Sequence, residues 1–229
     1  MIYIIDTANL EKIRECMEFY PIDGVTTNPT IISKENTGFL PLIKSIRELI
    51  GPDKQLHIQA TESTAEGMVK EAVALQEAVG GNFYVKIPVT REGLKATAIL
   101  HKMGIKVTET AIFTQQQALM AAKAGADFVA PYVNRLDNIV CDGCYVVEEI
   151  VTLFKEHDLN TQVLAASFKN PEQVHKVALC GGHAVTVAPE IFPALINHPL
   201  TDKAVSDFMN DWSSVYGDKT VLDLLGKRD

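Results

Sequence analysis

The stretch that decides the fold is FYVKIPVTREGLKATAILHKM, residues 83–103. Residues 83–88 alternate between two faces, one apolar and the other carrying Tyr84 and Lys86, which is the period of a β-strand. After a short turn, residues 91–103 carry apolar side chains at helical spacing. A strand followed at once by an amphipathic helix is one βα unit, and repeated units build a parallel sheet covered by helices.

The same unit recurs along most of the chain, with strand starts every ~20–35 residues, the length of a βα unit. The eight predicted strands are residues 2–6, 24–27, 55–60, 83–88, 106–113, 128–133, 162–168 and 184–188. Amphipathic helical segments follow the strands at residues 40–50, 65–78, 91–103, 115–124, 146–157, 171–179 and 190–197. The alternation predicts an α/β protein.

Eight units can close into a (β/α)8 barrel, and a doubly wound open sheet is the alternative. No G-x-G-x-x-G follows the first predicted strand, where a dinucleotide-binding fold would place it. Polar residues end nearly all the strands, and in a barrel those ends converge on one mouth. The sequence therefore favours a single TIM barrel.

The chain continues beyond the eighth unit, from about residue 200. Residues 204–216 form a predicted helix with one apolar side, which must be buried on its own barrel or on a neighbouring subunit. Residues 218–229 also have a helical pattern and could contact another subunit. Because no linker interrupts the chain, we expect residues 1–229 to form one domain with an extra C-terminal helix.

The composition limits the classes of partner. The 229 residues include 21 basic and 29 acidic side chains, for a formal charge of −8. An acidic surface does not attract nucleic acid or anionic membranes, so a phosphorylated substrate would need a local basic pocket. The N-terminus has no signal-peptide pattern, and no stretch reaches the ~18 apolar residues of a membrane span. We expect a cytoplasmic protein that binds neither nucleic acid nor membrane.

Cysteine and histidine positions do not indicate a metal centre. Cys141 and Cys144 form a C-x-x-C, but no second pair of ligands stands at matching spacing. The six histidines are scattered, without an H-x-x-x-H pair. We expect reduced thiols in a loop and helix start, no metal and no cofactor, which argues against a zinc-dependent aldolase.

Lys86 has the strongest chemical implication. Strand alternation turns it toward the barrel interior, where a charged amine is costly. Burial lowers the pKa of a lysine and frees its amine to attack carbonyl groups. The alternative is a surface lysine on a strand of the opposite phase, and the pattern alone supports both readings equally.

Polar residues at the ends of the first two strands are candidates for the mouth of the barrel. Asp6 follows four apolar or aromatic residues, although Asp6-Thr7-Ala8-Asn9 also suits a helix N-cap, which the local pattern slightly favours. Thr26 and Asn28 share a face and could hydrogen-bond substrate hydroxyls. Their alternative is turn formation, since Asn-Pro is a common turn dipeptide.

Three further polar residues end the third, fifth and sixth strands. Gln59, Thr110 and Tyr132 could together hold a water molecule and relay a proton. None of the three is distinctive alone.

Serine and basic residues gather at the ends of the sixth and seventh strands. Arg135, Ser167 and Lys169 could cradle a phosphate there. For Arg135 the alternative is a salt bridge with Asp137.

Four motifs, in order and at matching separations, resemble the transaldolase family. They are DGVTTNPT at residues 23–30, VKIP at 85–88, APYVNR at 130–135 and AASFK at 165–169. The resemblance covers the chain from its first residue to about residue 212, and it is closer to the small fructose-6-phosphate aldolase-like subfamily.

This resemblance implies a class I aldolase barrel, circularly permuted so that the Schiff-base lysine lies on the fourth strand. It implies that Lys86 forms an imine with a ketone such as dihydroxyacetone or fructose 6-phosphate, and that Asp6 assists proton transfer and orients a donor hydroxyl. It also implies rings of five subunits, or ten when stacked, that exchange C-terminal helices. The remaining implied roles are donor-hydroxyl binding by Thr26 and Asn28, water binding by Gln59, Thr110 and Tyr132 with Tyr132 as acid/base, and phosphate binding by Arg135, Ser167 and Lys169.

Within the resemblance, two positions separate aldolase from transaldolase. Transaldolases carry glutamate where this chain has Gln59 and phenylalanine where it has Tyr132. A tyrosine hydroxyl can protonate or deprotonate the enamine, so that free ketone leaves. Two features depart from the aldolase pattern: Glu109, which should point into the helical layer, and the loop at 138–144, which lacks the glycine-rich sequence.

The sequence therefore predicts reversible cleavage of fructose 6-phosphate to dihydroxyacetone and D-glyceraldehyde 3-phosphate. A second reading is a transaldolase of the pentose phosphate pathway, which transfers the dihydroxyacetone unit between sugar phosphates. A third is a catalytically idle barrel that binds a sugar phosphate.

Overall fold

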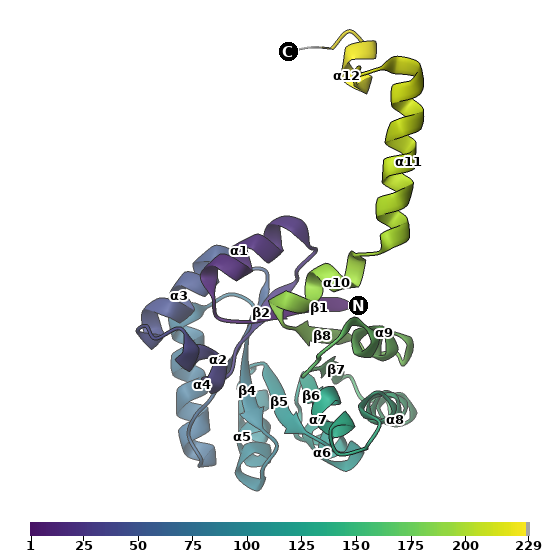
Figure 1. The fold of residues 1–229 in the computed structure, drawn as a ribbon. Coiled ribbons are helices and arrows are strands. Elements are labelled where there is room, and N and C mark those ends of the chain that lie inside the picture. Colours follow the sequence, from purple (N-terminus) through teal and green to yellow (C-terminus); the bar gives the residue numbers. More distant parts are fainter. Residues whose placement is uncertain (228–229) are drawn as a thin grey trace. The chain divides into compact units, whose positions relative to one another are not determined.

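A computed structural model describes residues 1–227, and in it the eight predicted strands form a closed parallel barrel in sequence order. The first strand pairs with the second and the eighth, which closes the ring. Figure 1 shows the strands inside a layer of helices. The strands are β1 (Ile2–Asp6), β2 (Gly24–Thr26), β3 (Gln55–Gln59), β4 (Phe83–Pro88), β5 (Val107–Ile112), β6 (Phe128–Pro131), β7 (Gln162–Ala165) and β8 (Ala184–Val187).

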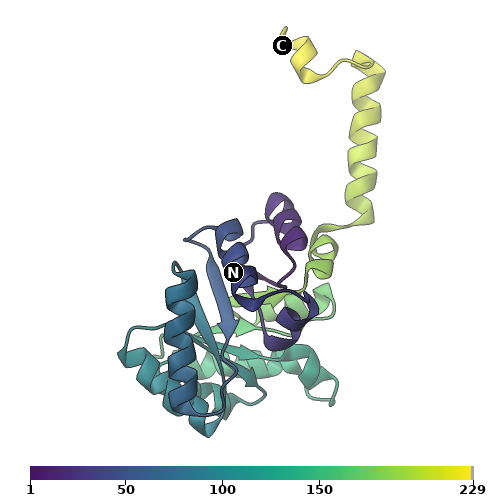
Figure 2. The ribbon, with the colours of Figure 1, turned by 90° about the vertical axis from the view of Figure 1, so that its left-hand side faces the viewer.

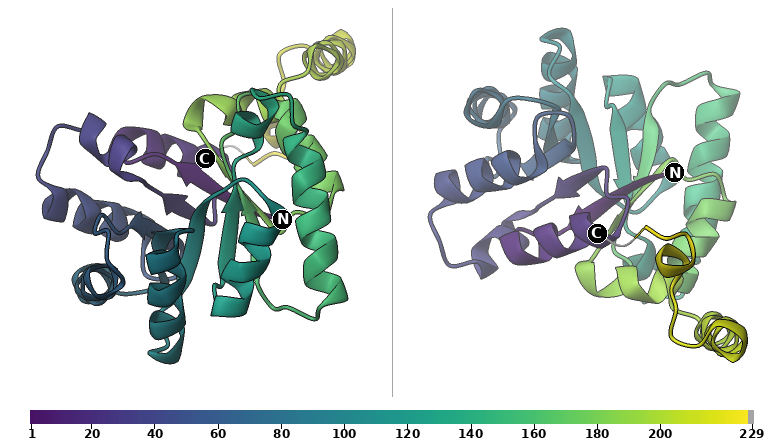
Figure 3. Two further views of the ribbon diagram at one scale, coloured as in Figure 1. Left: turned by 90° about the horizontal axis from the view of Figure 1, so that it is seen from below. Right: turned by 90° about the horizontal axis from the view of Figure 1, so that it is seen from above.

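Helices cover the outside of the strands, as the two views of Figure 3 show. The predicted helices are present within a few residues. Helix α1 follows the first strand, where the N-cap alternative for Asp6 placed a helix without giving its bounds. Two more helices, α2 and α7, were not predicted, because both are short. The helices are α1 (Leu10–Phe19), α2 (Pro29–Lys34), α3 (Phe39–Ile50), α4 (Ala65–Val79), α5 (Arg91–Lys102), α6 (Gln115–Ala124), α7 (Val133–Asp137), α8 (Gly143–Glu156) and α9 (Pro171–Leu179).

Several predicted strands are too long at their carboxyl ends. The sixth was predicted to reach Val133, but Val133 begins helix α7. The seventh was predicted to reach residue 168, but β7 ends at Ala165, and Ser167 has a φ of +64°. Left-handed backbone interrupts regular strand geometry, as it also does at Ala111 (φ +59°) in the irregular part of β5. Because these strands end early, the polar residues that follow them lie at the mouth of the barrel.

The predicted alternation along β4 is confirmed. Tyr84 packs inside the barrel against Ile4, Phe128, Leu164 and Ala184. The residues on its other face, Phe83, Val85 and Ile87, are buried and lie on the helical side. Side-chain alternation therefore turns Lys86 inward, two residues above the aromatic layer.

The chain divides into two compact units, residues 1–192 and 193–229. After the 3₁₀ turn η1 (Pro189–Ile191) and the short helix α10 (Phe192–Ile196), the second unit contains α11 (Pro199–Tyr216) and α12 (Val221–Leu224), seen in Figure 2. The apolar side of α11 is not covered by other residues of this unit.

Two predictions concern this tail. The helix predicted at 204–216 is confirmed and begins earlier, at Pro199, with His198 as its N-cap. The helical pattern at 218–229 gives one short helix, α12, while residues 228–229 lie outside the described part of the chain. The prediction of one domain with an extension from about residue 200 stays a prediction.

Candidate active site

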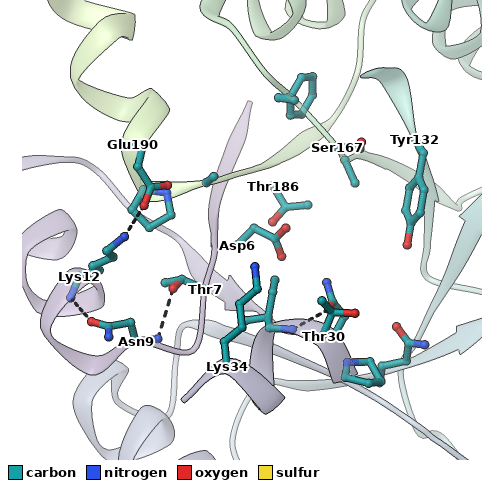
Figure 4. A pocket seen from close by; sticks show the side chains of 18 of the residues that line it. Asp6, Thr7, Asn9, Lys12, Thr30, Lys34, Tyr132, Ser167, Thr186 and Glu190 are labelled. Atoms are coloured by element: carbon teal, nitrogen blue, oxygen red, sulfur yellow. Dashed lines mark hydrogen bonds and ion pairs between the residues drawn. The ribbon is translucent and has the colours of Figure 1, made fainter. Parts of the chain in front are cut away.

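A cavity of about 690 Å³ lies at the carboxyl ends of the barrel strands. Figure 4 shows Asp6, Thr186, Tyr132 and Ser167 facing it from different parts of the barrel. Enzymes of this fold carry their chemistry at this face. Eight of the ten predicted site residues line the cavity, namely Asp6, Asn28, Gln59, Lys86, Tyr132, Arg135, Ser167 and Lys169. The other two, Thr26 and Thr110, hydrogen-bond to residues of the lining.

Lys86 reaches the cavity from β4 and is only 5% exposed. Its Nζ donates a hydrogen bond to the backbone carbonyl of Thr27, at 2.8 Å. Burial lowers the pKa of Lys86, while the charge of Asp6 opposes that shift. The alternative of a surface lysine is therefore wrong, and burial favours the neutral form of this amine.

Asp6 ends β1 and faces the cavity near Lys86. Its Oδ1 accepts a hydrogen bond from the hydroxyl of Thr26, at 2.8 Å. Burial raises the pKa of Asp6, while the charge of Lys86 and the bond from Thr26 act in the other direction. The N-cap that the local pattern slightly favoured for Asp6 is wrong, because Asn9 caps helix α1 by accepting from the backbone of Lys12.

Asn28 combines the two readings that the sequence left open. Its Oδ1 accepts from the backbone N–H of Ile31, so the side chain is the N-cap of α2. The same side chain lines the cavity, which leaves its amide N–H groups to face a ligand. Thr26, in contrast, is fully buried behind the lining and contacts Asp6.

Thr110 and Tyr132 are brought together from β5 and the end of β6. Their hydroxyl oxygens lie 3.1 Å apart, at hydrogen-bonding distance. Phe113 packs edge-on against the Tyr132 ring, and the Arg135 guanidinium lies 4.7 Å from the centre of that ring. These contacts hold the phenol at the cavity, which Gln59 lines from β3.

The predicted phosphate-binding group also assembles. Arg135, Ser167 and Lys169 all line the cavity, from α7 and the segment after β7. The predicted alternative, a salt bridge from Arg135 to Asp137, is not formed. Asp137 instead accepts hydrogen bonds from Gly143 N and Gln173 Nε2, so the guanidinium is left to the cavity.

Several residues of the lining were not predicted from the sequence. Thr186 is the third residue of β8, and its hydroxyl hydrogen-bonds to that of Thr26. Lys34 lines the cavity from α2, and an ion pair between Lys12 and Glu190 lies at its edge (Figure 4). The alternation of Ala184 and Thr186 along β8 would have identified Thr186, as it identified Lys86 along β4.

His57 forms part of the layer beneath Lys86 and was also missed. It is fully buried, and its ring stacks on Tyr84 with centroids 4.5 Å apart. Its Nδ1 lies 2.9 Å from the hydroxyl of Thr108 and its Nε2 lies 3.0 Å from Oε1 of Gln55. Burial above all, and then the charge of Lys86, hold the pKa of His57 well below its ordinary value, which favours the neutral ring.

Glu109 points away from the cavity, as the sequence predicted. Its side chain is fully buried and accepts a hydrogen bond from Thr97 of α5 at 2.6 Å, while Oε2 has no partner. Burial raises the pKa of Glu109 to about 7. The strand is irregular just beyond it, with a register shift between Glu109 and Ile112.

The cysteines are free thiols, with Cys141 in a loop and Cys144 in the first turn of α8, as predicted. Burial raises the pKa of Cys144 to about 11, which makes it a poor nucleophile. Among residues 1–227, no helix is long and apolar enough to cross a membrane.

Known proteins resemble this chain over nearly its whole length. Residues 3–221 match the family described as transaldolase/fructose-6-phosphate aldolase. A probable transaldolase of Thermoanaerobacter sp. (strain X514) is 42% identical, across 93% of this chain and 97% of that protein. A probable fructose-6-phosphate aldolase of Streptococcus pneumoniae (strain ATCC 700669 / Spain 23F-1) is 38% identical, across 96% of this chain and 100% of that protein.

Solved structures share the barrel at low sequence identity. A chain described as a native KDPGal structure has a TM-score of 0.58 at 14% identity, covering 82% of this chain and 81% of that one. Inosine 5′-monophosphate dehydrogenase from Legionella pneumophila has a TM-score of 0.56 at 13% identity, covering 82% of this chain and 58% of that one. Likeness at this level shows the fold alone.

Proposed function

We propose, because this chain belongs to the transaldolase/fructose-6-phosphate aldolase family, that it is a class I aldolase acting on fructose 6-phosphate. The products are dihydroxyacetone and D-glyceraldehyde 3-phosphate, and the reaction is reversible. The observation that carries the proposal is the buried amine of Lys86, which faces the cavity with its pKa lowered by burial. No other kind of side chain forms an imine with a ketone.

The first step joins Lys86 to the ketone. The neutral amine adds to the carbonyl carbon to form a carbinolamine. Uptake of one proton and loss of one water molecule then leave an iminium cation. Burial increases the fraction of free amine at neutral pH, and Asp6 supplies a nearby carboxylate that stabilises the cation once it has formed. Asp6 also assists proton transfer and orients a donor hydroxyl in this proposal.

Cleavage then breaks the bond between C3 and C4 of the ketose. A base removes the proton of the C4 hydroxyl, the bonding electrons move to the iminium to form an enamine, and the aldehyde leaves. Protonation of the enamine at C3 and addition of water return free dihydroxyacetone and the amine of Lys86. We assign these proton transfers to Tyr132 and a water molecule held with Gln59 and Thr110, which the 3.1 Å contact between Tyr132 and Thr110 supports.

The substrate is held at its two ends. Thr26 and Asn28 bind hydroxyls of the dihydroxyacetone part, Asn28 directly through its free amide N–H groups and Thr26 through Asp6. Arg135, Ser167 and Lys169 bind the phosphate of the aldehyde part, because serine and cationic groups suit phosphate oxygens.

A transaldolase is the second candidate, favoured by the names of relatives such as the probable transaldolase of Aquifex aeolicus (strain VF5), 42% identical to this chain. The two activities differ in whether the ketone is released. The enzyme should be supplied with fructose 6-phosphate and no added aldehyde, and free dihydroxyacetone measured over time. Steady release through many turnovers supports the aldolase. Product that appears only after an aldose is added supports the transaldolase.

A catalytically idle barrel that binds a sugar phosphate is the third candidate. It would bind fructose 6-phosphate without forming a covalent adduct with Lys86. Reduction with borohydride in the presence of dihydroxyacetone distinguishes it, because only an iminium is trapped irreversibly.

The partners we propose follow from the same reaction. They are small ketones and sugar phosphates, without nucleic acid, membrane, metal or cofactor. We also propose a cytoplasmic homo-oligomer of five or ten subunits, with α11 providing the contact between subunits because its apolar side lacks a cover within the tail. Light scattering of the purified full-length protein tests the oligomer.

A further inference from the structure

Thr186 is one of the lining residues to which the proposed reaction assigns no role. It lies on β8, is 4% exposed and faces the cavity beside Asp6 (Figure 4). Its hydroxyl hydrogen-bonds to the hydroxyl of Thr26, which in turn bonds to Oδ1 of Asp6. Three neighbouring strands of the barrel thus contribute one hydrogen-bonded chain that ends at the proposed catalytic carboxylate.

The directions of these bonds follow from the number of protons available. An ionised carboxylate has no proton, so Thr26 must donate its single hydroxyl proton to Asp6. Thr26 then has no proton left for Thr186, and the proton between the two hydroxyls must come from Thr186. When Asp6 is protonated, the chain can reverse, with Asp6 donating to Thr26 and Thr26 donating to Thr186.

We propose that Thr186 is a positioning residue that acts through Thr26 to keep Asp6 ionised and aimed at the reaction centre. The proposal rests on the proposed function, because it needs Asp6 to act as a carboxylate. The hydrogen bond from Thr186 polarises the hydroxyl of Thr26 and strengthens its bond to the carboxylate. The chain is stronger when it ends on a charge, so Thr186 favours the ionised form of Asp6 over the protonated form.

The other groups around Asp6 show why its ionised form needs the hydrogen bonds from these hydroxyls. Burial raises the pKa of Asp6, and the charge that opposes it comes from Lys86 on β4. The strands on either side, β2 and β8, present the neutral hydroxyls of Thr26 and Thr186. Lys86 must lose its proton to attack the ketone, and at that moment the hydroxyl chain is the remaining stabiliser of the carboxylate.

The test compares Thr186→Val, which keeps the shape and removes the hydroxyl, with Thr186→Ser, which keeps the hydroxyl. Thr161→Val is the matched control, because Thr161 is another buried threonine that donates one hydrogen bond, to the backbone of Ala126, and it does not line the cavity. The readout is the pH profile of kcat/KM for cleavage of fructose 6-phosphate by the full-length enzyme.

We expect Thr186→Val to lower kcat/KM about fivefold at neutral pH, the equivalent of one neutral hydrogen bond. The acid limb of its profile should move to higher pH by about half a unit, because Asp6 is protonated more readily. Thr186→Ser and Thr161→Val should keep the acid limb of the unmodified enzyme. If the valine variant does not fold, Thr186→Ala against Thr186→Ser gives the same comparison, since these two differ only in the hydroxyl.

Two results would overturn the proposal. One is a folded Thr186→Val enzyme whose acid limb matches that of the unmodified protein. The other is a Thr186→Ser enzyme as impaired as Thr186→Val, which would make the shape of the side chain the cause. Failure of the proposed function looks different, because the unmodified enzyme would then form no borohydride-stable adduct with dihydroxyacetone.

Discussion

Asp6 and Glu109 are carboxylates in different regions, one half-buried at the mouth of the barrel and one fully buried between β5 and helix α5. Burial raises the pKa of both, to about 7 for Glu109. Asp6 has a cation in range, Lys86, and a hydrogen bond from Thr26. Glu109 has one bond, from Thr97, and an oxygen without a partner. A raised pKa therefore does not by itself indicate a catalytic group. Asp6 differs from Glu109 in its neighbours, the cation Lys86 and the hydroxyl of Thr26.

Strand β5 shows the same contrast between its two faces at two adjacent residues. Glu109 and Thr110 are adjacent, so their side chains point to opposite faces of the strand. Thr110 reaches the hydroxyl of Tyr132 on the inside, while Glu109 meets the helical layer on the outside. We propose a role in chemistry for the inner face of β5 and a role in stability for its outer face.

The largest effect on activity is expected from substitution of Lys86, the cation that lies near Asp6. Lys86→Arg should lower turnover at least about 1,000-fold, because a guanidinium stays protonated and cannot attack a ketone. The control is Lys95→Arg on the exposed surface of α5, where only an ion pair with Glu66 is affected. Steady-state cleavage of fructose 6-phosphate is the measurement. Turnover by Lys86→Arg within about tenfold of the unmodified enzyme would show that the amine is not the nucleophile.

Next is the direct contrast between the two carboxylates. Asp6→Asn should lower kcat/KM about 100-fold, the contribution of a general acid or base, and Glu109→Gln should change it less than about twofold. Both substitutions remove one charge and keep the shape. Comparable losses in the two variants would contradict the division between the two regions.

The inner face of β5 is tested by Tyr132→Phe, which removes the hydroxyl that contacts Thr110 and keeps the ring beside Arg135. We expect cleavage to fall about 30-fold, because protonation of the enamine slows. Formation of the borohydride-stable adduct should be unchanged, because it precedes that step. An equal loss of cleavage and of adduct would assign Tyr132 to imine formation instead.

The smallest effect on activity, and a clear effect on stability, is expected for Glu109→Gln. The folded-state pKa of Glu109, about 7, lies above its ordinary value of 4.5, so the folded protein binds more protons than the unfolded chain between these values. The stability of the unmodified protein should therefore fall as pH rises through this window, by about 3 kcal/mol in total from this group. Urea unfolding at pH 5 and pH 8 should show that Glu109→Gln lacks this part of the decline. The same pH dependence in both proteins would rule out Glu109 as its source.

Much of the fold could be predicted from the sequence, because strand alternation and helical spacing report burial directly. Alternation of Tyr84 and Lys86 with apolar neighbours correctly gave the direction of Lys86. Helices α2 and α7 were missed because six and five residues give no periodicity. The ends of β6 and β7 were predicted too far along, since local patterns do not show where the next strand stops pairing.

The assembly of the site could be predicted only in part. The polar residues at strand ends were found, since parallel strands bring those ends to one mouth. Hydrogen-bond partners on strands far apart in the sequence were not predicted, because the bond between Thr26 and Thr186, for example, spans 160 residues. The cap at Asn9 and the bonds of Asp137 likewise depend on geometry that a linear pattern does not contain.

The central claim is that Lys86 forms an imine with a small ketone. The most direct test is to incubate the full-length enzyme with dihydroxyacetone and borohydride, and then to locate the adduct by peptide mass spectrometry. We expect one reduced adduct per chain, on the peptide that contains Lys86, and none in Lys86→Arg. An unmodified Lys86 peptide, or an adduct confined to other lysines, would contradict it.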